Sequence, residues 1–251
     1  MCETKLRMTM KIFSCAVVFV CCMIALSEAD VRKSKDIDTV GQYIWNIITG
    51  GYRGNGPCRG LKEEFLKLMN NISTVYTRWG RNTCPESADL VYSGYIGGGL
   101  YSHKGAGTNP QCMPRVPEYN AALQSTGGSR GYIYGAEYET ASYVSAFSTR
   151  NNGDAVCAVC RARGKSATLT IPAKQNCPED WTKEYEGLMM GSNSGHYGIN
   201  YLCVDENPEM IPGSTANKDG LLLYPVVSTC GSLPCAPYTA NNELSCVVCT
   251  A

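Results

Sequence analysis

The chain has 251 residues, and its 22 Lys and Arg side chains balance 22 Asp and Glu. A net charge of +0 removes the electrostatic case for nucleic acid or an anionic membrane as a partner. Hydrophobic residues make up 44%, enough for a globular core, and abundant Gly (26) and Tyr (16) beside scarce Phe (4) favour short strands and turns.

Residues 1–29 have the pattern of a secretory signal peptide. Lys5, Arg7 and Lys11 form a basic start, residues 12–26 form an apolar run, and small residues precede the expected cleavage after Ala29. The alternative is an uncleaved membrane anchor, but the apolar run is shorter than the roughly 20 residues that span a bilayer. We therefore expect a secreted protein without a membrane segment after cleavage.

Residues 30–74 form an N-terminal extension. Its glycine-rich loop at 50–60 carries Cys58. Apolar side chains at positions 61, 65, 68, 69 and 72 recur at spacings of three and four, which predicts a short amphipathic helix over 61–72. The helix either packs on its own domain or serves oligomerisation, although under two heptads is short for a coiled coil. Asn71 opens an Asn-Ile-Ser sequon and is the expected glycosylation site.

A cysteine frame occurs twice in residues 75–251. Each copy opens with Cys-Pro-Glu, has a middle cysteine followed five residues later by Pro-Glu, and closes with C-x-x-C. The cysteines are Cys84, Cys112, Cys157 and Cys160 in copy one (75–166), and Cys177, Cys203, Cys246 and Cys249 in copy two (167–251). So many matching offsets indicate an internal duplication.

Short strands fill both copies in the sequence pattern. Runs rich in β-branched and aromatic residues, separated by Gly, Asn and Ser loops, predict strands at 75–79, 90–95, 131–138, 143–147, 155–159, 167–171, 221–227 and 244–248. Turn signals about every ten residues predict an all-β, mainly antiparallel fold.

The cysteines are expected to form structural disulfides. Two C-x-x-C pairs could instead hold zinc or act in redox exchange, but the secretory signal favours disulfides, and a polar turn follows the first pair. Ten cysteines belong to the frame once Cys230 and Cys235 are counted. Cys58 is then the odd cysteine and the candidate interchain link. We expect no metal and no cofactor.

The chain's two histidines, His103 and His196, each stand nineteen residues after an opening cysteine. Equivalent positions favour a shared structural role over a metal-binding or pH-sensing pair. A hydrolase that uses one of them is an open alternative, although no G-x-S-x-G elbow is present. The repeated Pro-Glu acids are read as turn formers before acid/base catalysts.

Tyrosines crowd copy one at positions 92, 95, 101, 132, 134, 138 and 143. Burial of their rings is the favoured interpretation, and an exposed row that stacks on sugars or cross-links oxidatively is the alternative. Trp79, Tyr95, His103, Trp181 and His196 are the candidate binding residues.

Several motifs together resemble a known family. They are VYTRWGR at 75–81, YSGY at 92–95, YSHKG at 101–105, GAEY at 135–138, IPAK at 171–174, WTKEY at 181–185, PGS at 212–214, CGSLPC at 230–235 and CVVC at 246–249. In this order they resemble the C-terminal noncollagenous domain of invertebrate short-chain (spongin-type) collagens and, more distantly, that of collagen IV. The resemblance covers residues 75–251.

The resemblance implies two tandem β subdomains related by a pseudo-twofold axis. It also implies nested disulfides, which pair Cys84 with Cys160, Cys112 with Cys157, Cys177 with Cys249, Cys203 with Cys246, and Cys230 with Cys235. The chain departs from such collagens because it has no Gly-X-Y segment and so no triple helix of its own. The helix at 61–72 and Cys58 are the candidates for taking over assembly.

We therefore expect a non-enzymatic, secreted structural protein of the extracellular matrix. The organic matrix of a skeleton or shell is one variant of this expectation. Its expected partners are further copies of itself and matrix polymers. The alternative is a secreted lectin-like module that binds glycans.

Overall fold

The computed structural model describes residues 72–105, 107–121, 129–140 and 145–251. The signal peptide, Cys58, Asn71 and the predicted helix, apart from Ile72, lie outside the described residues. Residues Ile72–Ala251 group into one unit. In the described part of the chain, no helix is long and apolar enough to cross a membrane.

The described residues are mostly strand, as the sequence predicts. The strands are β1 (Ser73–Trp79), β2 (Ala88–Gly98), β3 (Gln111–Pro114), β4 (Tyr134–Tyr138), β5 (Val156–Arg163), β6 (Thr168–Pro172), β7 (Thr182–Gly191), β8 (Leu202–Asp205), β9 (Leu221–Pro225) and β10 (Ser245–Thr250). Seven predicted strands correspond to β1, β2, β4, β5, β6, β9 and β10, whereas β3, β7 and β8 are not predicted.

The strand predicted at 143–147 is wrong over its described residues, where the 3-10 helix η2 (Ser145–Arg150) forms instead. Phe147 is buried in the core, and its carbonyl oxygen accepts a hydrogen bond of 2.9 Å from the Thr140 hydroxyl. This local contact closes a turn, so the apolar run signals one buried anchor and not a strand.

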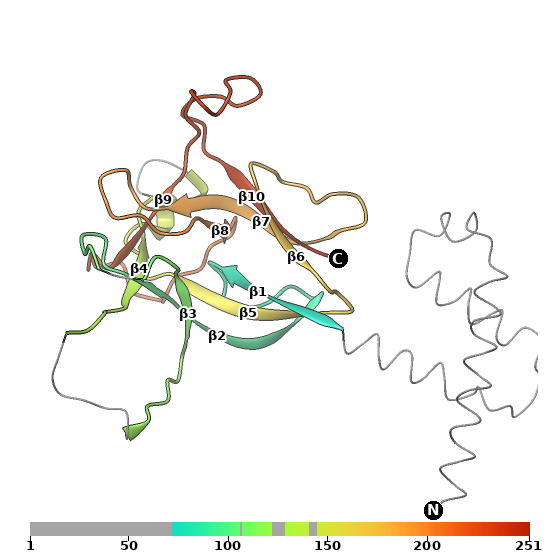
Figure 1. Ribbon diagram of the computed structural model, residues 1–251. Coiled ribbons are helices and arrows are strands. Elements are labelled where there is room, and N and C mark those ends of the chain that lie inside the picture. The colour runs from blue at the N-terminus through green and yellow to red at the C-terminus, as the bar shows by residue number, and fades with distance from the viewer. Residues whose placement is uncertain (1–71, 106, 122–128, 141–144) are drawn as a thin grey trace, which may run out of the picture. The chain divides into compact units, whose positions relative to one another are not determined.

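The strands pair in the order β6-β10-β7-β8-β1-β5-β2-β4-β9, with β3 added beside β2 (Figure 1). A further pairing of β9 with β7 closes a loop of strands. One core cluster gathers Ile96, Tyr138, Met190, Leu221 and their neighbours. A second contains Tyr76, Cys160, Tyr185 and Cys246. Residues of both copies contribute to each core.

The strand pairings of copy one recur in copy two. Pairings β1–β5, β2–β5, β2–β3 and β2–β4 are matched by β6–β10, β7–β10, β7–β8 and β7–β9. The match extends to isolated bridges, because Glu137 pairs with Asp154 as Val227 pairs with Glu243. It also extends to backbone conformation, since Gly80 and Ala173, which stand at equivalent positions, both have positive φ.

A glycine at equivalent positions of β2 and β7 explains how closely β3 and β8 approach these strands. Gly94 and Gly187 both stand ten residues after an opening cysteine. A Cβ atom on Gly94 would collide with the carbonyl oxygen of Met113 on β3, and one on Gly187 with that of Val204 on β8. Both positions therefore require glycine.

Contacts between the copies run in one direction only. β1 of copy one pairs with β8 of copy two at Trp79 and Val204, and β4 pairs with β9 in parallel. An exact twofold axis would also pair β6 with β3. Within the described ranges β6 pairs only with β10, and β3 only with β2. The expected pseudo-twofold relation thus holds for each copy's internal pairings but not for the contacts between copies.

Candidate functional site

Five disulfide bonds join the cysteines of the frame. They link Cys84 to Cys160, Cys112 to Cys157, Cys177 to Cys249, Cys203 to Cys246, and Cys230 to Cys235. These are the pairs that the resemblance implies. The spacing of each C-x-x-C sends its two sulfurs to opposite faces of one strand, so Cys157 lies in the first core and Cys160 in the second. Each closing strand is thereby bonded to two different upstream segments.

A tyrosine eight residues after each opening cysteine joins β2 to β3 in copy one and β7 to β8 in copy two. The Tyr92 hydroxyl donates to the carbonyl oxygen of Cys112 at 3.0 Å. The Tyr185 hydroxyl lies 2.9 Å from the carbonyl oxygen of Cys203 and 3.2 Å from that of Thr77 on β1. The second contact exists because β1 covers Tyr185, and burial raises the pKa of Tyr185 above its ordinary value.

Where β1 covers copy two, the contact is polar. The buried Glu184 carboxylate accepts hydrogen bonds from the hydroxyls of Tyr76 (2.7 Å), Ser87 (2.7 Å) and Thr250 (2.6 Å). Burial, and then the bond to Glu184, raises the pKa of Tyr76. Two of the three donors come from copy one, so this carboxylate holds the copies together.

Arg78 on β1 adds an ion pair to the same contact. Its guanidinium lies 2.7 Å from Oδ2 of the buried Asp205 on β8, and its Nε donates to the same oxygen at 2.8 Å. The guanidinium also stands 5.8 Å from the centre of the Tyr185 ring. Such a pair is costly to break, because the partner would be left as an uncompensated buried charge.

The counterparts of these contact residues are open and apolar. Val91 holds in copy one the position that Glu184 holds in copy two, and the two side chains are 54% and 6% exposed. Leu169 on β6 is the counterpart of Tyr76 on β1, and these are 41% and 6% exposed. Copy one's β2–β3 face and copy two's β6 are therefore left uncovered within the described part of the chain.

The Arg78–Asp205 ion pair also has an apolar counterpart. Ile171 holds in copy two the position of Arg78, and Pro114 holds in copy one that of Asp205. Both partners of each polar contact are thus replaced together by apolar residues, Tyr76–Glu184 by Leu169–Val91 and Arg78–Asp205 by Ile171–Pro114. A paired replacement keeps two surfaces complementary, whereas a single replacement would leave one polar group unpaired.

The β4–β9 contact has an open counterpart as well. Leu222 lies two residues before Tyr224, which pairs with β7, and Tyr132 lies two residues before Tyr134, which pairs with β2. Leu222 is buried against β4, whereas Tyr132 is 62% exposed. Val227, the counterpart of Glu137 on β4, is also exposed. At both places copy one covers a surface of copy two, and the equivalent surface of copy one is uncovered within the described residues.

The candidate binding residues do not share one site. Trp79 packs on the first core, and Tyr95 stacks 5.7 Å below the Arg115 guanidinium. Trp181 is half-buried after a turn in which its backbone N–H donates to the carbonyl oxygen of Pro178 at 3.2 Å. Trp79 and Tyr95 flank the same end of β5 but lie on opposite faces of the sheet, because Trp79 is level with Cys157 and Tyr95 with Val156, and Trp181 lies before β7.

Each histidine packs edge-on against a tyrosine at equivalent positions. The ring centres are 5.7 Å apart for His103 and Tyr134 and 5.6 Å apart for His196 and Tyr224. His196 also meets Tyr101 at 4.6 Å, and its buried Nδ1 has no hydrogen-bond partner among the described residues. The repeated contact is what a shared packing role requires.

The expected burial of the copy-one tyrosines is complete for Tyr138, partial for three others and wrong for Tyr92 and Tyr132. Tyr138 is fully buried, but Tyr92 and Tyr132 are exposed, and Tyr95, Tyr101 and Tyr134 are half-buried. Tyr143 lies outside the described residues. The exposed members occupy positions whose counterparts in copy two are covered by copy one, so their exposure follows from the one-way contact.

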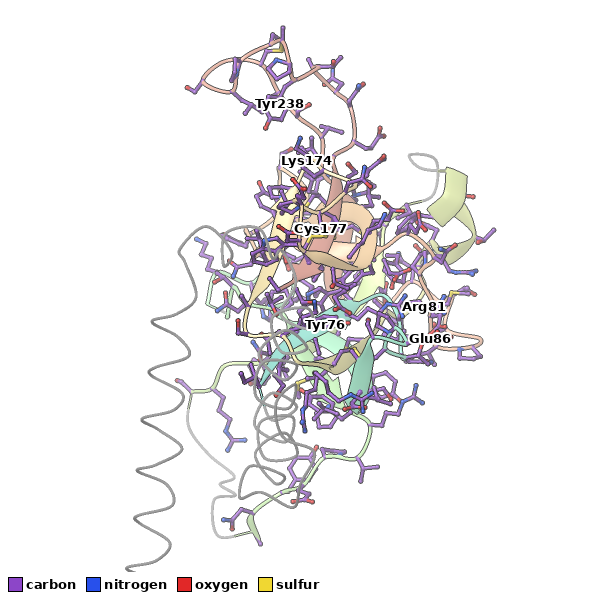
Figure 2. The ribbon with its side chains drawn as sticks, turned by 90° about the vertical axis from the view of Figure 1, so that its right-hand side faces the viewer. Tyr76, Arg81, Glu86, Lys174, Cys177 and Tyr238 are labelled. Carbon is purple, nitrogen blue, oxygen red and sulfur yellow. A yellow bond between two sulfur atoms is a disulfide. The ribbon has the colours of Figure 1, made fainter. Side chains whose placement is uncertain are left out.

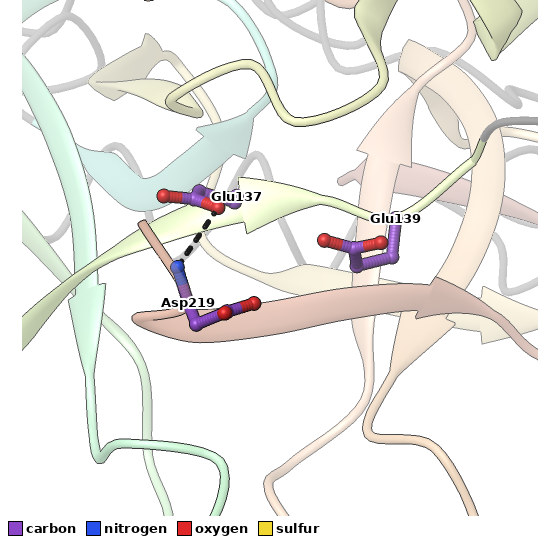
Figure 3. Close-up of side chains that lie close together, drawn as sticks. All are labelled: Glu137, Glu139 and Asp219. Carbon is purple, nitrogen blue, oxygen red and sulfur yellow. Dashed lines mark hydrogen bonds between the residues drawn. The ribbon is translucent and has the colours of Figure 1, made fainter. Parts of the chain in front are cut away.

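Pairing of β4 with β9 gathers an acidic cluster that the sequence pattern does not predict. Glu137, Glu139 and Asp219 lie close together (Figure 3), with carboxylate oxygens within 4.8 Å of one another. Glu137 accepts bonds from the backbone N–H groups of Lys218 (3.0 Å) and Asp219 (3.2 Å). Burial and the two neighbouring carboxylates raise the pKa of Glu139. An all-oxygen set suits a hard cation, but the Glu137 oxygens already serve to hold residues 218–219.

No known protein-family model matches the chain.

Proposed function

We propose that the protein is a secreted structural component of the extracellular matrix, built from two copies of an ancestral half-domain like that of short-chain collagens. Further copies of the chain assemble head to tail, and the assembly binds matrix polymers without catalysis. Five disulfides support an oxidising, extracellular compartment.

The observation that carries this proposal is the pair of open surfaces described above. Copy two of one chain offers β6 with Leu169, and copy one of the next chain offers the β2–β3 face with Val91. Docking them repeats the contact that β1 makes with β7 and β8 inside the chain. Exposed apolar patches on a secreted protein mark interaction sites.

The contact is heterologous, because the two surfaces differ. A heterologous contact leaves one unused surface at each end of a growing assembly, so the assembly either closes into a ring or keeps growing as a fibre. Either outcome suits a matrix protein.

The test measures oligomeric mass by size-exclusion chromatography with light scattering on the mature secreted chain carrying Cys58→Ser. We expect concentration-dependent oligomers, and monomers for Val91→Asp or Leu169→Asp, because each places a charge in the apolar contact. Leu90→Asp is the matched control. Leu90 is as exposed as Val91, but its counterpart Lys183 is exposed even though β1 covers the neighbouring Glu184, so this variant should still assemble.

Mixing the two variants sharpens the test. Val91→Asp retains an intact β6, and Leu169→Asp retains an intact β2–β3 face, so an equimolar mixture should give a 1:1 dimer that grows no further. A parent chain that stays monomeric at every concentration would sink the proposal. So would a mixture that remains monomeric.

A lectin-like function is the second candidate. It is favoured by the exposed Tyr132, whose ring centre lies 6.4 Å from that of Tyr134, which in turn contacts His103. Aromatic rings on a surface can stack on sugar faces. A glycan array probed with the parent and with Tyr132→Ala separates the candidates, since only lectin binding gives signals that the variant loses.

A further inference from the structure

The loop between β4 and β5 grips copy two. Inside the chain, Ala155 forms a β-bridge with Met210, and the Ile211 N–H donates to the carbonyl oxygen of Asp154 at 3.0 Å. Nε of Arg150 donates to the carbonyl oxygen of Pro208 at 2.7 Å. These contacts hold residues 208–214, the segment that follows β8, along the end of the loop.

The loop between β9 and β10 repeats this architecture. The Tyr138 N–H donates to Gly153 O and the Asn152 N–H to Tyr138 O. In copy two the Ser228 N–H donates to Asn242 O and the Asn241 N–H to Ser228 O, so the same ladder closes both loops. Asn152 and Asn241 even share a positive φ, 57° and 63°.

The two loops differ in how their inner part is fastened. The hydroxyl of Thr140 bonds the carbonyl oxygen of Phe147 in copy one, and the Cys230–Cys235 disulfide stands at nearly the same positions in copy two. Phe147 anchors its loop in the core. The copy-two loop instead projects from the sheet (Figures 1 and 2), with Tyr238 among its residues, so a covalent fastener replaces the missing core anchor.

The segment that this loop should grip is also uncovered. Counting from the middle cysteine, Pro117–Glu118 and Tyr119 are the counterparts of Pro208–Glu209 and Met210. Pro208 is buried under the copy-one loop, whereas Pro117 is exposed and Tyr119 is 77% exposed. In Figure 1 this stretch leads away from the end of β3. The projecting loop belongs to copy two and the uncovered segment to copy one. They therefore form a second pair of unused surfaces, arranged like β6 of copy two and the β2–β3 face of copy one.

We propose that residues 229–243 of one chain form a clasp over residues 117–121 of a second copy. The proposal rests on the head-to-tail assembly and adds a second, separately testable contact to it. Leu244 takes the place of Ala155 against Tyr119, and Glu243 takes the place of Asp154 beside Asn120. The disulfide keeps the clasp in its gripping conformation before the partner arrives, which lowers the entropy cost of binding.

A cysteine trap tests this geometry in the full mature chain carrying Cys58→Ser. Asp154 and Ile211 are neighbouring antiparallel partners, and such opposed positions suit a disulfide. The counterpart variant Asn120→Cys with Glu243→Cys should therefore give covalent oligomers on a non-reducing gel. Asn120→Cys with Ser232→Cys, which moves the second cysteine into the Cys230–Cys235 turn, should stay unlinked.

A binding measurement accompanies the trap. Tyr119→Ala should raise the dissociation constant for self-association by roughly tenfold, in line with the loss of one aromatic anchor. Tyr197→Ala is the matched control, because the Tyr197 side chain is exposed, and the bond from its backbone N–H to the carbonyl oxygen of Tyr101 in copy one does not depend on that side chain.

The outcomes separate the clasp from the assembly. If the parent assembles and Leu169→Asp dissociates it, while the trap stays unlinked and Tyr119→Ala binds like the parent, the clasp is refuted and the assembly stands. If the parent never assembles, both fail. Covalent oligomers from the Asn120–Glu243 pair alone, with weakened binding by Tyr119→Ala, establish the clasp.

Discussion

Raising the pH above 10 should unfold this protein steeply. Tyr76, Tyr138 and Tyr185 are all buried, and burial is the main reason why the pKa of each phenol lies above its ordinary value. In the unfolded chain the same phenols ionise near pH 10. Between that pH and the raised folded pKa, the unfolded state loses protons that the folded state keeps.

The sign and size of the effect follow from proton linkage. A folded pKa that is raised gives stability that is fully present below the unfolded pKa and is lost as the pH rises past it. Each such phenol lowers the free energy of unfolding by about 1.4 kcal/mol per pH unit above pH 10. Three phenols together give a slope of about 4 kcal/mol per unit, so about two pH units would exhaust the stability of a typical domain.

Urea denaturation followed by circular dichroism between pH 9 and pH 12 measures this slope. Tyr138→Phe removes one phenol, whose hydroxyl donates to the carbonyl oxygen of Glu209, and should reduce the slope by about a third. Tyr132→Phe changes an exposed phenol and should leave it unchanged. A parent slope of one phenol or less, or equal slopes for parent and Tyr138→Phe, would refute the reasoning.

Three further predictions concern packing, charge and assembly. Gly187→Ala should lower the thermal midpoint strongly, because its Cβ meets a backbone carbonyl, whereas Gly135→Ala, with open space at that position, should not. Arg78→Met should cost about 3–5 kcal/mol in urea denaturation by stranding the buried Asp205; a loss below 1 kcal/mol would contradict the ion pair's role. A non-reducing gel should show a covalent dimer or larger species that Cys58→Ser abolishes, and monomers in both would rule out the interchain link.

The duplicated frame could be predicted from sequence because cysteine offsets survive where other residues change. Strands such as β5 and β10 are visible for a related reason, since their β-branched and small apolar residues are buried on both faces. β7 is hidden because Glu184 and Gly187 interrupt its pattern. The acid is buried only because three hydroxyls satisfy it, and the glycine is set by a strand close in space. Neither the satisfied acid nor the close strand can be inferred from local secondary-structure propensity.

The one-way contact illustrates a different limit. Val91 and Glu184 can be aligned by counting from their cysteines, but nothing in the count says that one is covered. Coverage depends on where β1 lies, and β1 meets β8 through a single residue pair, Trp79 with Val204. The acidic cluster is equally invisible, because Glu137 and Asp219 meet only through the parallel pairing of β4 with β9. Long-range pairing of this kind leaves no periodic trace in the sequence.

The nested disulfides also limit how far the unit Ile72–Ala251 can stretch under load. A pull on its two ends passes through Cys84–Cys160 and Cys177–Cys249 and bypasses nearly everything between each pair. Three segments can still extend: the stretch before Cys84, the link from Cys160 to Cys177 and the last two residues. Together they are about 30 residues, or roughly 100 Å of extended chain. Without the bonds the same 180 residues could lengthen to roughly 600 Å. Under tension the unit would therefore extend by a small amount and then resist further extension.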